Sequence, residues 1–177
     1  MAAINASMVK ELRDRTQAGM NDCRNALVET EGDMEKAVEV ILKKGLAKAA
    51  SRAGRIAAEG EVATWVSADS KRGVIVEINS QTDFVSRGDD FKGLVKTVVD
   101  VASKAPKNAD LGALPCPGTD KTVESLRAEL VGKTGEHLVV RRWAALEAAE
   151  PTGFVHAYVH AGGKLAVLVH AEGPKGA

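Results

Sequence analysis

The chain has 177 residues, 45% of them hydrophobic and 27% charged, so it can build a buried core without unusual composition. Lysine plus arginine and aspartate plus glutamate each number 24, which gives zero net charge and no basic excess of the kind that nucleic-acid-binding proteins carry. Because no stretch approaches the roughly 20 apolar residues that span a bilayer and no signal or transit peptide opens the chain, we expect a cytoplasmic protein without a nucleic-acid or membrane partner.

The first 46 residues predict a small module of three helices. Ser7 is a candidate cap for the first helix, and Gly19 is a natural end for it because glycine tolerates the left-handed conformation that closes helices. A second helix is expected over residues 21–29. Three helices in so few residues form a core that is marginal by itself.

The third helix begins near Met34, and its apolar residues recur three and four positions apart. Gly45 is expected to end it. Residues 47–59 are rich in alanine with interspersed arginine and lysine, residues that favour helix but offer little apolar bulk. This segment therefore predicts a semi-rigid helical connector.

Residues 60–147 change character and predict a core subdomain of antiparallel strands with packed helices. Alternating apolar residues and turn-forming residues indicate a hairpin, and a long amphipathic segment and a shorter one indicate helices. The expected strands are residues 61–67, 74–79 and 137–145, and the expected helices are residues 89–104 and 122–131. The fold class predicted from this order of elements is α+β.

Residues 148–177 predict one further hairpin, with strands over residues 154–160 and 164–170. A single hairpin is not stable alone, so we expect it to be part of a second core subdomain that this chain contains only in part. The oligomeric state does not follow from the sequence.

Two histidines, His156 and His160, lie on one expected strand, and His170 lies on the strand that follows. A zinc site needs three or four converging ligands, and no CxxC motif is present to supply cysteine ligands. The alternative is that these are ordinary hydrogen-bonded or surface imidazoles. No nucleophile motif and no phosphate-binding loop is present, so we expect no catalytic residue, metal or cofactor, and no enzyme.

The loop at residues 81–85 places an aromatic side chain, Phe84, between an acidic residue and a valine directly after a strand. One interpretation is structural: Thr82 or Asp83 caps the next helix and Phe84 tucks under it as a hydrophobic staple. The other is functional: Phe84 is presented as an anchor for a pocket in a partner protein. The residues of the loop leave both interpretations open.

Four segments in order along the chain resemble the elongation factor Ts family, and the resemblance covers essentially the whole sequence. They read VKELRDRTQAGMNDC at residues 9–23, NSQTDFV at 79–85, GEHLVVRR at 135–142 and HAGGKLAVLV at 160–169. Asn21 stands where the family usually has a second methionine. The long form of the family continues well beyond residue 177, so we expect the chain to be a fragment or a truncated form.

The resemblance implies a guanine-nucleotide exchange factor of protein biosynthesis. Such a factor binds elongation factor Tu in its GDP-bound and nucleotide-free states and promotes GDP release by disturbing the magnesium and phosphate site. The N-terminal module resembles a ubiquitin-associated fold, which leaves a ubiquitin-associated-type protein-binding adaptor as the alternative function. That alternative predicts nothing for residues 60–170.

The resemblance also assigns residues to roles. It implies that the loop entering the partner beside its magnesium is formed by Thr82, Asp83, Phe84 and Val85. It implies that further contacts with the partner are made by Arg13, Met20, His160, Gly162, Gly163 and Lys164.

Overall fold

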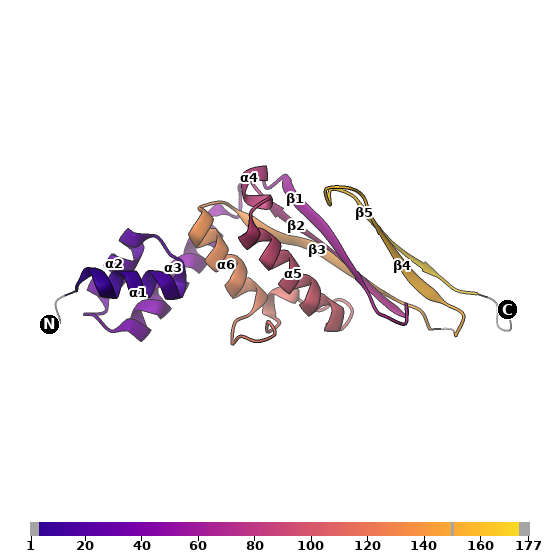
Figure 1. The fold of residues 1–177 in the computed structure, drawn as a ribbon, viewed down its shortest axis with the longest axis horizontal. Helices are drawn as coiled ribbons and strands as arrows, with labels where there is room; N and C mark the ends of the chain where they lie inside the picture. Colours follow the sequence, from indigo (N-terminus) through magenta and orange to yellow (C-terminus); the bar gives the residue numbers. More distant parts are fainter. Residues whose placement is uncertain (1–3, 150, 174–177) are drawn as a thin grey trace. The chain divides into compact units, whose positions relative to one another are not determined.

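The computed structural model describes residues 4–149 and 151–173 (Figure 1). It divides into two compact units. One is built from the chain up to Ile56 together with Ser125–Leu138, and the other from Ala57–Glu124 together with the chain from Val139 onward. No helix among the described residues is long and apolar enough to cross a membrane.

The first unit begins with three helices, α1 (Ala6–Thr16), α2 (Met20–Glu29) and α3 (Met34–Arg52), which confirms the predicted three-helix module. Its core is small and aliphatic, consistent with the lack of aromatic residues in this part of the sequence. The fully buried members are Leu12, Cys23, Ala26, Leu27 and Ala37.

The cap predicted for α1 at Ser7 is wrong, because Ser7 lies inside the helix and Asn5 caps it. Asn5 has extended backbone angles, and its side-chain oxygen accepts a hydrogen bond from the Met8 amide at 3.0 Å. Asparagine and serine are about equally good caps, so two candidates this close in sequence could not be separated by residue type alone.

The helix end predicted at Gly45 is also wrong, since α3 continues through it to Arg52. The residues after Gly45 are mostly alanine and lysine, which extend a helix readily. Gly45 is buried, and a Cβ atom there would lie 3.3 Å from the carbonyl oxygen of Ala128 on α6 (Val123–Thr134). Gly45 therefore allows two helices to approach closely, and residues 47–52, expected in a separate connector, belong to α3.

The second unit contains a three-stranded sheet of β1 (Glu59–Val66), β2 (Arg72–Ser80) and β3 (Leu138–Glu147), in the order β1-β2-β3. β1 pairs antiparallel with β2 along the whole length of β1. The predicted strands are therefore confirmed with ends that differ by one or two residues. The short helix η1 (Leu111–Ala113) lies in the loop between α5 (Asp89–Lys104) and α6.

Helix α5 (Asp89–Lys104) has the bounds predicted from its apolar stripe, and it covers one face of the sheet (Figure 1). Val74, Val76 and Ile78 of β2 alternate along the strand and are almost fully buried, as strand periodicity requires for the face under a helix. Phe91 and Val98 supply the matching buried residues of α5.

The last two strands, β4 (Phe154–Val159) and β5 (Ala166–Ala171), form the predicted antiparallel hairpin. It packs on the other face of the sheet, where Gly73 leaves room for it. A Cβ atom on Gly73 would lie 2.6 Å from Val155 and 2.8 Å from Leu168. The predicted α+β class is confirmed, because three helices are followed by antiparallel sheets with packed helices. The exact domain boundaries stay a prediction.

Candidate functional site

The loop that follows β2 is a short, well-capped helix, α4 (Asp83–Ser86). Thr82 is its N-cap, and its hydroxyl accepts a hydrogen bond from the Val85 amide at 3.4 Å. The Ser80 hydroxyl donates to the Thr82 carbonyl at 2.8 Å, and the Ser86 hydroxyl donates to the Asp83 carbonyl at 3.2 Å. These local bonds hold the loop in one conformation at the end of the strand.

Phe84 projects from α4 into solvent, with 87% of its surface exposed. The capping half of the structural interpretation is correct, because Thr82 caps the helix, but the tucked aromatic residue is absent. Phe91 on the buried side of α5, by contrast, is 1% exposed. An exposed phenylalanine on a rigid turn forgoes the free energy of burial, which is the arrangement expected of an anchor for a partner's pocket.

Asp83 stands beside Phe84 and forms an ion pair with Arg87 one helical turn later, at 3.0 Å. Both side chains are mostly exposed, and pairs of this kind contribute little to stability. The carboxylate of Asp83 can therefore change partners at low cost.

Two residues that sequence reasoning missed support this loop from the sheet. Arg141 donates to the Asn79 side chain at 2.7 Å and to the Ala57 carbonyl at 2.8 Å. Asn79 is buried and pairs across the sheet with Gly60. In the sequence, Asn79 and Arg141 were indicated only by their positions in two of the segments that resemble the family, residues 79–85 and 135–142.

The hairpin turn at residues 160–164 lies at the same end of the sheet as α4 (Figure 1). Lys164 bonds Glu59 at 2.5 Å, and Glu59 pairs with Ser80, the last residue before the α4 loop. The Val62 amide also donates to the Gly163 carbonyl at 2.7 Å. The structure therefore brings together two of the predicted site segments, which are about 80 residues apart in sequence.

Within the turn, Gly162 and Gly163 have φ angles of 83° and 65°, in the left-handed region that glycine accepts most easily. His160 is exposed, and one of its ring nitrogens lies 3.0 Å from the Tyr158 hydroxyl. His160 follows β4 instead of belonging to it, so the predicted strand end at that residue is one position too long.

The other predicted contacts, Arg13 and Met20, lie in the first unit. Met20 begins α2 and is 56% exposed, so it does not fill the three-helix core. The Arg13 side chain is exposed and forms no ion pair with any described residue. Both side chains are therefore available on the surface of the module.

A metal centre finds no support in the described parts of the chain, where no three histidine, cysteine, aspartate or glutamate side chains gather as a ligand set. His156 lies across from Val169 on the hairpin, whereas His170 lies across from Val155 and contacts Glu172 at 2.6 Å. Successive strand positions point to opposite faces, so the two histidines do not converge.

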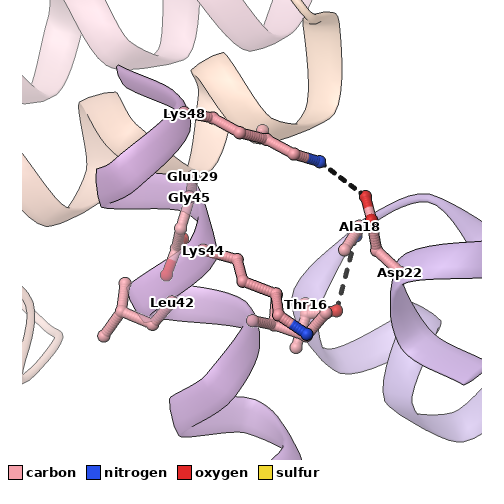
Figure 2. A pocket seen from close by; sticks show the side chains of 10 residues that line it. Thr16, Ala18, Asp22, Leu42, Lys44, Gly45, Lys48 and Glu129 are labelled. Atoms are coloured by element: carbon pink, nitrogen blue, oxygen red, sulfur yellow. Dashed lines mark hydrogen bonds and ion pairs between the residues drawn. The ribbon is translucent and has the colours of Figure 1, made fainter. Parts of the chain in front are cut away.

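A small cavity in the first unit was not predicted from the sequence (Figure 2). Its volume is about 20 Å³, and an ion pair between Lys48 and Asp22, 2.7 Å long, closes one side. A space of this size holds about one water molecule and no organic ligand. The cavity is therefore a packing feature between helices.

The described residues thus include an exposed aromatic side chain, a neighbouring turn and a helical module with a surface methionine. Comparison with known proteins shows the family to which they belong. Residues 81–177 match the family described as Elongation factor TS. The chain is 49% identical to Elongation factor Ts of Arthrospira platensis over 175 residues, which is 98% of this chain and 69% of that protein.

Other relatives are longer. Elongation factor Ts of Clostridium perfringens is 49% identical over 167 residues, covering 93% of this chain and 54% of that protein. Elongation factor Ts of Aromatoleum aromaticum is 47% identical, covering 98% of this chain and 57% of that protein. The chain thus belongs to the elongation factor Ts family, and it spans about half the length of several relatives that it matches.

Proposed function

We propose that this chain is a guanine-nucleotide exchange factor that binds elongation factor Tu carrying GDP and promotes release of the nucleotide. The observation that carries the proposal is the exposure of Phe84 on a capped helix at the end of β2. Membership of the elongation factor Ts family supports elongation factor Tu as the partner. The chain itself performs no covalent chemistry in this proposal.

The exchange step follows from how P-loop GTPases hold GDP. In them a magnesium ion bridges phosphate oxygens and a P-loop hydroxyl, so displacement of the metal weakens nucleotide binding. The ring of Phe84 is a large apolar wedge that gains free energy by entering a pocket, and its entry moves the groups that hold the metal. The exchange factor then weakens the binding of GDP, and GDP weakens the binding of the exchange factor by the same ratio, as thermodynamic linkage requires.

The direct test is release of a fluorescent GDP analogue from elongation factor Tu with and without the chain. We expect the release rate to rise with chain concentration and then to level off. A rate that does not change at any concentration, although the chain is folded by circular dichroism, would exclude exchange activity. A ubiquitin pull-down run in parallel tests the adaptor alternative.

Asp83→Ala is expected to slow exchange less than removal of the aromatic ring does. The carboxylate offers a charge and two acceptor oxygens that can reorganise polar groups near the partner's magnesium. We expect a loss of about three- to tenfold, in the range of the net contribution of one ordinary hydrogen bond. The loss should shrink in EDTA, where the metal is already removed, and an equal loss in both buffers would contradict this role.

His160→Ala combined with Lys164→Ala is expected to slow exchange modestly, by about two- to fivefold, as for contacts at the edge of an interface. Lys164 also bonds Glu59, so the melting temperature must be measured to separate lost contact from lost stability. Normal exchange by the folded double variant would leave the turn with a structural role only.

Met20→Ala is expected to weaken binding to elongation factor Tu by about five- to twentyfold while leaving the fold intact, because an exposed methionine is an adaptable interface residue. Titration of the partner measures the affinity, and thermal unfolding checks the fold. If the dissociation constant and the melting temperature both stay unchanged, Met20 is not part of the interface.

A further inference from the structure

Arg141 of β3 joins three segments of the chain at the base of the α4 loop. Its Nε atom donates to the side-chain oxygen of Asn79 at 2.7 Å, and its Nη2 atom donates to the carbonyl oxygen of Ala57 at 2.8 Å. These partners are 62 and 84 residues away in sequence, one near the end of β2 and the other just before β1. One guanidinium group therefore ties β2 and the segment that enters β1 to β3.

Asn79 passes this restraint to the residues that hold Phe84. Asn79 is 7% exposed, and the next residue, Ser80, is fully buried. The Ser80 hydroxyl donates to the carbonyl of Thr82, which is the residue that caps α4. Two consecutive residues of β2 therefore connect Arg141 to the cap of the helix that carries the exposed ring.

Hydrogen bonds hold the Arg141 side chain in place more than burial does, since 49% of that side chain is exposed. Its replacement therefore removes little packing. The neighbouring residue, Arg142, is 79% exposed and donates to the Glu77 carboxylate of β2 at 2.6 Å. Arg141 lies 3.4 Å from the same carboxylate. Replacement of Arg142 thus removes an arginine and an ion pair with β2 while the bonds to Asn79 and Ala57 remain.

We propose that Arg141 is a positioning residue for nucleotide exchange, which holds the α4 loop so that Phe84 enters the partner GTPase in one orientation. This inference rests on the proposed function, and it concerns a residue that acts through Asn79 and not by entering the partner's pocket. Displacement of a functional group by about 1 Å can lower a rate strongly even when the group itself is intact. Because other segments also contact the partner in the proposed complex, a misplaced loop should lower the rate of GDP release much more than the affinity.

The test measures GDP release from elongation factor Tu over a range of chain concentrations, which separates the maximal release rate from the half-saturating concentration. Arg141→Ala is expected to lower the maximal rate about five- to tenfold and to change the half-saturating concentration less than about twofold. Arg142→Ala is the matched control. It should change neither quantity by more than about twofold, because exposed ion pairs contribute little.

A conservative variant and a double variant distinguish positioning from a general loss of stability. Arg141→Lys keeps the charge but lacks the guanidinium fork that reaches both acceptors, so it should lower the maximal rate about two- to threefold. Asn79→Ala removes one of the two bonds and should lower the rate about three- to fivefold. Its addition to Arg141→Ala should lower the rate no further, because that bond is already lost. Thermal unfolding of each variant shows that it is folded at the assay temperature.

The outcomes separate this inference from the function on which it rests. If the unmodified chain does not accelerate GDP release, the proposed function fails. If it does, but folded Arg141→Ala and Arg141→Lys reach the same maximal rate as the unmodified chain, the positioning role is refuted. If Arg141→Ala does not fold, Arg141→Lys alone decides. A higher half-saturating concentration with an unchanged maximal rate would also refute the role, in favour of direct contact between Arg141 and the partner.

Discussion

Phe84→Ala is expected to reduce the rate of GDP release from elongation factor Tu by about tenfold or more, the size expected for an aromatic anchor residue. The 87% exposure of this ring means that its removal costs the free protein almost no packing. The loss should therefore appear in the exchange step. Affinity for the partner should fall much less, because Arg13, Met20 and the 160–164 turn remain.

The matched control is Phe154→Ala, which removes another exposed phenylalanine from the same unit. Phe154 is 49% exposed at the start of β4, outside every segment proposed to contact the partner. Its loss should leave exchange unchanged. If folded Phe84→Ala exchanges GDP at the full rate in magnesium, the ring is dispensable and the proposed wedge is wrong.

Gly60→Ala is expected to lower the free energy of unfolding by more than about 2 kcal/mol, through backbone strain and overlap. Gly60 has a φ of 139°, a conformation that residues with a side chain rarely adopt, and an added Cβ would overlap the Ile78 carbonyl. Because Gly60 pairs with Asn79 next to the α4 loop, the damage should reach the exchange loop as well.

Chemical denaturation with two-state analysis measures this loss, and Gly93→Ala is the control. Gly93 lies inside α5, and an added Cβ there meets no atom within 4 Å. That variant should gain up to about 1 kcal/mol from helix propensity. Equal stability of the two variants would show that the conformation at Gly60 is not strained.

Most of the fold could be predicted because its elements have strong periodic patterns. The apolar stripe of α5 fixed both of its ends, and alternation located every strand to within a few residues. The wrong cap at Ser7 reflects a choice between two neighbouring residues, whereas the error at Gly45 concerns a residue whose role depends on a distant part of the chain. Glycine is typical of a helix end, but Gly45 lies inside α3, where the absence of a side chain lets Ala128 approach closely. No local sequence pattern indicates that contact.

The candidate site was predictable in part. The sequence of the loop allowed Phe84 to be buried under the next helix or exposed as an anchor for a partner. Only its exposure in the folded chain distinguishes these two interpretations. The support from Arg141 to Asn79 and the link from Lys164 to Glu59 join positions about 60 and 105 residues apart, so they required the sheet register. The resemblance supplied the roles, which the physical pattern alone did not.

In the proposed mechanism, the chain promotes GDP release by disturbing the partner's magnesium site. The most direct measurement is the ratio of GDP release rates with and without the chain, taken once in magnesium and once in EDTA. We expect a large acceleration in magnesium that falls steeply in EDTA, because the metal is then already absent. An acceleration of the same size in both buffers, or none in magnesium, would contradict it.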